Sequence, residues 1–177
     1  FYRLLTGGGG TEAVPSSAQG DPPAGREVAF MRNIARSADV YASVVKKAND
    51  DAGTSTVTYP TSDIGAKLRV VSQLVAGGLK SRIFLISWAG NNFDTHANQT
   101  STADPTIGAH AGLLGELSTA VSAFMQDMKN RGFSEKVSGM TFSEFGRRVA
   151  ENGSVGTDHG TAAPLFVFGS NVNGGIY

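Results

Sequence analysis

The predicted fold class depends on the stretch RIFLISW at residues 82–88. Its central residues, Ile83 to Ile86, are all apolar and show no polar alternation. A continuous apolar run of this length is typical of a strand that is buried on both faces, as in a parallel sheet. The segment therefore predicts a central strand, and the other elements can be placed around it.

Helical and apolar patterns follow this strand. Residues 110–131 place apolar side chains three or four positions apart, as an amphipathic helix does, and residues 136–142 form a second apolar segment. A strand, a helix and a strand form a βαβ unit, which is almost always parallel and right-handed. A third strand at residues 164–168 is expected to run antiparallel, because residues 149–160 are too polar and glycine-rich for a crossover helix. The predicted fold class is α/β, with a mixed, mostly parallel sheet flanked by helices.

Two further amphipathic helices are predicted before the first strand. One covers residues 27–48, and the other starts near Ser62-Asp63 and ends at Gly77-Gly78. Residues 1–25 are rich in Gly, Pro, Ser and Ala and are expected to form a flexible loop or linker. Residues 26–177 are then expected to form part of one domain. Its core is expected to include Tyr41, Phe124 and Met128.

The composition excludes several classes of protein. A net charge of zero, with 17% charged residues, argues against a nucleic-acid binder. No stretch approaches the length of an apolar membrane span. The chain has no cysteine, so any metal must be held by carboxylates and imidazoles. The 177 residues suit one domain, and because they begin at Phe1 we expect them to be a piece of a longer protein.

Three short motifs concentrate the residues that can bind a metal or a phosphate. They are Asp94-Thr95-His96, Ser143-Glu144-Phe145-Gly146-Arg147 and Gly156-Thr157-Asp158-His159-Gly160. The first two follow the ends of the predicted strands at 82–88 and 136–142, and ligands bind beyond the carboxyl ends of parallel strands. The third motif reaches the same edge if the strand at 164–168 is antiparallel. The sequence thus predicts that the three motifs meet.

Carboxylates and imidazoles without thiolates suit Zn, Mn or Fe(II). Two such ions can clamp a phosphate or sulfate ester and activate a nucleophile. The guanidinium of Arg147 is expected to contact the anionic group of a substrate. The candidate metal ligands are Asp94, His96, Glu144, Asp158 and His159.

Each motif also has a plainer interpretation. Asp94-Thr95 can form a turn or a helix cap, with His96 merely exposed. Ser143-Glu144 can begin a short helix, and Asp158-His159 can form a tight turn. His110 has no acidic neighbour and is expected to be a cap or surface residue.

Taken in order, the motifs resemble the bacterial "domain of unknown function 1501" family. The resemblance rests on FDTHANQ at residues 93–99, His110 with its helix, SEFGRR at 143–148, ENGS at 151–154 and GTDHG at 156–160. That family is grouped with the alkaline phosphatase and sulfatase superfamily. The superfamily implies a mixed sheet between helices, with paired metal ions at the carboxyl edge, in proteins that commonly carry export signals.

By this resemblance, Asp94 and His96 correspond to a ligand pair for one metal, and Asp158 and His159 to the late ligand loop of the superfamily. Glu144 stands where relatives often have Asp followed by His, and here Phe145 replaces that His. The nucleophile and the first metal-binding Asp of the superfamily lie early in the chain, and residues 1–25 offer neither. The nucleophile is therefore expected upstream of this chain.

The resemblance implies a fragment of an exported metal-dependent hydrolase, periplasmic or extracellular, that acts on phosphate or sulfate esters. Its cofactor would be a divalent metal and its substrate a small anionic ester. The alternative is a non-catalytic exported protein that uses the same fold for binding or structure, because a fold does not guarantee an activity.

Overall fold

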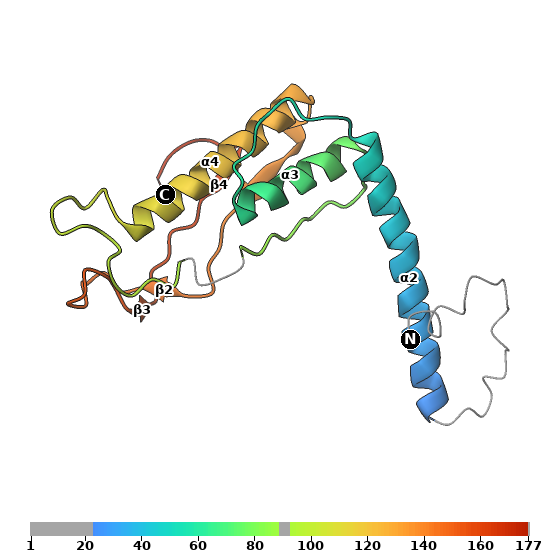
Figure 1. Ribbon diagram of the computed structural model, residues 1–177, viewed down its shortest axis with the longest axis horizontal. Helices are drawn as coiled ribbons and strands as arrows, with labels where there is room; N and C mark the ends of the chain where they lie inside the picture. Colours follow the sequence, from blue (N-terminus) through green and yellow to red (C-terminus); the bar gives the residue numbers. More distant parts are fainter. Residues whose placement is uncertain (1–22, 89–92, 177) are drawn as a thin grey trace.

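The computed structural model describes residues 23–88 and 93–176, and Figure 1 shows the course of the chain. Its three long helices are α2 (Pro23–Asp51), α3 (Asp63–Ala76) and α4 (Ala109–Asn130), and a short 3-10 helix, η1 (Ser134–Lys136), follows α4. These bounds confirm the three helices predicted from the sequence. No helix in the described residues is long and apolar enough to cross a membrane. Residues 1–22 of the predicted linker lie outside the described residues.

Local sequence explains where α3 begins and ends. Ser62 is the N-cap, and its hydroxyl accepts a hydrogen bond from the Gly65 N–H at 3.3 Å. At the other end, the Gly77 N–H donates to the Gln73 carbonyl at 2.9 Å. A Cβ on Gly77 would collide with the backbone of Ala48 in α2. The glycine that ends α3 therefore also allows α2 to approach it closely.

The core lies between α3 and α4. It is formed by side chains from the facing sides of the two helices, namely Ile64, Leu68, Ala120, Phe124 and Met128. The burial of Phe124 and Met128 confirms two of the predicted core residues. The helix α2 meets α3 at its C-terminal end and otherwise extends away from the other helices (Figure 1). Tyr41 on α2 is 57% exposed, so its prediction as a core residue is wrong, because no described segment covers that part of the helix.

A buried carboxylate ties the helical core together. Asp127 is 1% exposed and accepts hydrogen bonds from Tyr59 Oη at 3.0 Å, from Ser72 Oγ, and from Arg131 Nε at 2.9 Å. Arg131 also donates to the Ala52 carbonyl at 2.6 Å. Burial by itself raises the pKa of Asp127, but the hydrogen bonds, led by that from Ser72, outweigh burial and the pKa lies below its usual value. The ionised carboxylate thus links α3, α4 and the connection between α2 and α3.

The strands correct the predicted fold class. β1 (Ser138–Met140) pairs antiparallel with β4 (Val167–Gly169), and β2 (Gly146–Arg147) pairs antiparallel with β3 (His159–Gly160). The described residues are mostly helical with two small antiparallel sheets, so the predicted α/β fold with a mixed, mostly parallel sheet flanked by helices is wrong. The antiparallel direction predicted for the last strand is confirmed by the pairing of β1 with β4.

Residues 82–88 explain why the sheet prediction is wrong. No backbone hydrogen bond joins this segment to another described part of the chain. Ile83 and Leu85 are 87% and 78% exposed, whereas Ile86 and Trp88 pack against the core of α3 and α4. A strand exists only where a neighbour accepts and donates its ladder hydrogen bonds. The prediction of a strand buried on both faces is therefore wrong, because the segment packs only one side against the core and has no strand partner in the described residues.

Candidate metal centre

The pairing of β2 with β3 brings two of the three sequence motifs together. Arg147 lies opposite His159 in the ladder, and the Arg148 N–H donates to the Asp158 carbonyl at 2.9 Å. Gly160 lies against the backbone of Arg147, where a Cβ would approach to less than the closest normal contact. Only glycine fits at this position, which accounts for the glycine at the end of the third motif.

A second set of hydrogen bonds brings the first motif to the same place. The N–H groups of Asn98 and Gln99 donate to the carbonyls of Ser154 and Val155 at 3.0 and 2.8 Å. The Asn152 side chain donates to the His96 carbonyl at 2.9 Å. The loop after residue 93 is thereby held against the loop that precedes β3.

Three of the predicted ligands converge where these loops meet. Asp94 Oδ1 lies 2.7 Å from His159 Nε2 and 3.1 Å from His96 Nε2, and one donor atom from each residue lies within 4.8 Å of the others. The two imidazole rings are 4.8 Å apart. The side chains are partly open to solvent, with 37% of Asp94 exposed. Two nitrogens and one carboxylate oxygen therefore share one accessible position.

Electrostatics favour the ionised form of this carboxylate. The hydrogen bond from His159 is the main reason that the pKa of Asp94 lies below its usual value, and His96 adds to the effect against a smaller penalty from burial. A carboxylate must be ionised to bind a metal. Asp94 is thus in its binding form at neutral pH.

Asp158 lies beside this cluster of three side chains. Its Oδ1 is 3.5 Å from His96 Nδ1 and accepts a hydrogen bond from Asn152 Nδ2 at 3.1 Å. The bond from Asn152 is the main cause of its lowered pKa. In metal sites a carboxylate in this position, on the ring nitrogen remote from the metal, fixes the orientation of the imidazole. The geometry places Asp158 behind His96 rather than among the three converging donors.

Two other predicted residues lie outside the cluster of Asp94, His96 and His159. Glu144 is exposed and belongs to no group of converging metal-binding side chains in the described residues. His110 is exposed at the start of α4, as predicted, and its ring meets Phe93 edge to face at 5.9 Å.

Arg147 holds the loops of the site in place. Its Nη1 donates to the Thr157 carbonyl at 2.6 Å, and its Nη2 donates to the Phe93 carbonyl at 2.7 Å. Nη2 also lies 3.5 Å from Asp94 Oδ1. The guanidinium therefore connects the segments that carry Asp94 and His159.

Sequence reasoning missed the supporting residues of the site. The Phe145 ring stacks on His159 at 3.8 Å, and the Gln99 carboxamide links Thr95 to Thr157. Asn152 bonds both Asp158 and the backbone of His96. These residues lie inside or beside the sequence motifs, which is the only indication of their role that the sequence gives. Spacing alone does not show which side chains contact one another.

The donor set fits a divalent metal. Two imidazole nitrogens and one carboxylate oxygen are a common ligand set of catalytic zinc. Ligands about 2.1 Å from one tetrahedral ion lie roughly 3.4 Å from one another. The observed separations of 2.7 and 3.1 Å between Asp94 Oδ1 and the two Nε2 atoms are those of hydrogen bonds and are shorter than this, so these side chains would have to move apart to hold an ion.

Comparison with known proteins agrees with the ordered motifs of the site. The model of the family described as "Protein of unknown function (DUF1501)" matches residues 37–177. The chain belongs to the DUF1501 family. The matched region of this DUF1501 protein contains the three converging side chains and everything that supports them. No curated protein and no solved structure matches it.

Proposed function

We propose that this DUF1501 chain binds a divalent metal ion through Asp94, His96 and His159, and that it belongs to an exported metal-dependent hydrolase of phosphate or sulfate esters. One observation carries the proposal. Three side chains place metal-binding atoms at one solvent-accessible position, although Asp94 and His159 are 65 residues apart in the sequence. Three protein ligands leave a coordination position open, as in catalytic rather than structural zinc sites.

The bound ion would supply Lewis acidity and lower the pKa of a coordinated water. The surrounding residues would hold the metal ligands in place. Asp158 would fix the ring of His96, and the stacked Phe145 would shield one face of His159 from water. Arg147 Nη1 has a second N–H group besides the one that holds the Thr157 carbonyl, and this group would contact the substrate anion.

The choice of ester rests on the resemblance of the motifs to the alkaline phosphatase and sulfatase superfamily. That grouping is part of the proposal, as is export from the cytoplasm. Location can be tested by fractionating cells that express the natural protein and probing each fraction with an antibody. Recovery in the cytoplasmic fraction alone would contradict export.

The test of the metal site is elemental analysis of the purified protein beside an Asp94→Ala/His159→Ala double variant. We expect close to one equivalent of Zn, Mn or Fe in the wild type and its loss in the double variant. His110→Ala is the matched control, because it removes an exposed histidine outside the cluster. No metal in the wild type after reconstitution, or equal metal in all three proteins, would overturn the proposal. A positive result justifies a screen of phosphate and sulfate esters.

One observation favours the non-catalytic alternative. Asp94, His96, His159 and Arg147 already bond to one another, so they can join the two loops without an ion. In that case the double variant would lose stability with no change in metal content. Thermal unfolding of the metal-free wild type and the double variant, measured beside the elemental analysis, separates the two functions.

A further inference from the structure

An apolar groove of about 590 Å³ opens beside the cluster of Asp94, His96 and His159. One wall comes from α3 and α4, and the rims come from residues 85–88 and 140–145. Its volume lies within the usual range of small-molecule sites. The apolar lining residues include Leu68, Leu85, Trp88, Leu117, Phe142 and Phe168.

The charges of the groove restrict what it can bind. Among its lining residues only Asp94 and Glu144 are charged, and both are acidic. No lysine or arginine is among the described residues that line the groove. Two cations lie just outside this lining: Arg147 Nη2 is 3.5 Å from Asp94 Oδ1, and Lys67, which pairs with Asp63, donates to the Ser87 carbonyl at 2.6 Å. Without a bound cation, the acidic end would repel an anionic head group. With one, the groove offers a positive charge at one end and apolar walls along the rest.

The groove is continuous with the cluster. Asp94 lines the groove and accepts from both imidazoles, and Phe145 lines the groove and stacks on His159. A ligand whose anionic group sits on an ion at the three donors therefore has one apolar direction in which its remaining atoms can lie.

We infer that this groove binds the apolar alkyl or aryl group of an ester whose anionic group lies at the metal centre. The inference rests on the proposed function and narrows its substrate class to esters of hydrophobic alcohols or phenols. Burial of the apolar group in the groove supplies binding free energy, so esters of hydrophobic alcohols are favoured over nucleotides and polyphosphates.

The test compares the affinities of hexylphosphonate and methylphosphonate for the full 177-residue chain loaded with Zn²⁺. Neither compound contains an ester bond that could be hydrolysed. Trp88 lines the groove and is the only tryptophan of the chain, so its fluorescence reports occupancy directly. Each buried methylene strengthens binding roughly three- to fourfold, so burial of only three of the extra methylenes of hexylphosphonate would make it bind about thirtyfold more tightly, and we expect at least this difference. Equal affinities would overturn the inference.

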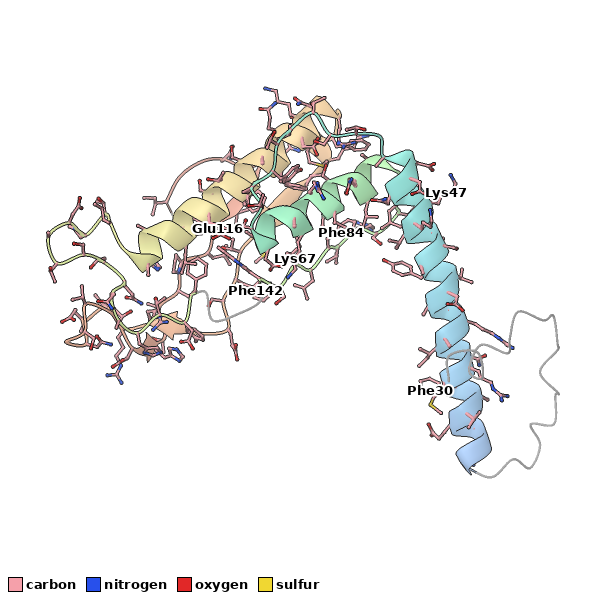
Figure 2. All side chains as sticks on the ribbon, viewed as in Figure 1. Phe30, Lys47, Lys67, Phe84, Glu116 and Phe142 are labelled. Atoms are coloured by element: carbon pink, nitrogen blue, oxygen red, sulfur yellow. The ribbon has the colours of Figure 1, made fainter. Side chains whose placement is uncertain are left out.

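Two phenylalanines provide a matched pair of variants. Phe142 lines the groove and is 70% exposed, whereas Phe30 lies on the distant α2 and is 60% exposed (Figure 2). Both can be replaced without opening the core. Phe142→Ser is expected to reduce the preference for hexylphosphonate at least threefold, and Phe30→Ser to leave it unchanged. The same loss in both variants would contradict a role of the groove.

Neutral alkanols separate this inference from the proposed function. If hexanol and octanol change the Trp88 signal of metal-free protein, with octanol binding more tightly and Phe142→Ser weakening both, the groove stands even where no metal binds. If zinc binds but neither alkanols nor phosphonates of increasing length change the Trp88 signal, the groove inference fails while the metal site stands. Zinc binding without any change in the Trp88 signal is also the result expected if a peptide segment covers the groove.

Discussion

Two aspartates of this chain accept several hydrogen bonds each, but in different surroundings. Asp127 is fully buried between α3 and α4 and is bonded to hydroxyls and a guanidinium. Asp94 lies on a loop, partly exposed, and is bonded mainly to two imidazoles. Hydroxyls and guanidinium groups are poor metal ligands, whereas imidazole is a common one. The hydrogen-bond partners of the two carboxylates therefore distinguish them. Asp127 is a permanent structural link, whereas Asp94 and its imidazole partners form a set of ligands that can bind an ion.

The largest expected effect is that of Asp127→Ala. It leaves Arg131 buried without its counter-charge, and breaking a buried ion pair costs about 3 to 5 kcal/mol. We expect urea denaturation to show a loss of unfolding free energy of this size. Asp94→Ala, the same change at the exposed carboxylate, should leave the urea midpoint of metal-free protein close to that of the wild type. Equal losses would show that both carboxylates are structural.

Asp158→Asn tests the comparison at the metal site, where Asp158 lies behind His96. Loss of the carboxylate behind His96 is expected to weaken Zn²⁺ binding about 10- to 100-fold, the usual effect of removing such an orienting group. A competition titration with a zinc indicator measures the change. Asp50→Asn on α2 is the control, because that carboxylate pairs with Lys46 far from the site. A complete loss of binding would instead identify Asp158 as a direct ligand.

Asp127 is expected to contribute to the pH dependence of stability. Because its pKa in the folded protein lies below the unfolded value of about 3.9, its contribution is fully present above that pH and is lost as the pH falls through the folded pKa. Asn at this position cannot titrate, so the stability of Asp127→Asn should fall less steeply than that of the wild type as the pH drops below about 4. Urea midpoints at a series of pH values measure both slopes. Parallel curves would mean that the buried carboxylate is not the titrating group.

The smallest effect is expected for Val155→Gly. Val155 has φ of 55°, and it and Asn98 are the non-glycine residues with positive φ in the described chain, both in the loops of the site. A left-handed conformation costs a β-branched residue roughly 1 to 2 kcal/mol, and glycine recovers most of it at some entropic cost. We expect a gain of about 0.5 to 1 kcal/mol in unfolding free energy by thermal denaturation. A loss would show that the valine side chain contributes more through packing than its backbone strain costs.

The helices could be predicted because their signals are local. The apolar spacing of α4, the Ser62 cap and the terminal Gly77 each act within a few residues. The sheet could not be predicted, because a strand depends on a partner and the run at 82–88 does not identify one. The same limit applies to Tyr41, whose helical spacing shows an apolar face but not what covers it.

The convergence of three site residues was predicted from the sequence, but the parallel sheet that was expected to bring them together is absent from the described residues. Asp94, His96 and His159 do meet, but the pairing of β2 with β3 and the hydrogen bonds of the Asn98 loop bring them together rather than the edge of a parallel sheet. Glu144 was placed by that edge argument, and it lies outside the cluster in the described residues. The positions of Asp158 behind His96 and of Arg147 between the loops depend on tertiary contacts that no spacing rule contains.

Residues 82–88 also have a consequence for the behaviour of the chain in solution. The Ser87 carbonyl accepts a hydrogen bond from Lys67, but no backbone–backbone hydrogen bond joins the segment to another described part of the chain. An extended apolar segment of this kind, without proline, is a template for pairing with another copy, the first step toward fibrils. Lys80 lies two residues before the segment and Arg82 is its first residue, and their like charges oppose such an approach. Salt screens this repulsion, so we expect light scattering to show faster self-association of the concentrated chain as ionic strength rises. The two positive charges thus protect this apolar segment, in which Ile83 and Leu85 are largely exposed, against self-association.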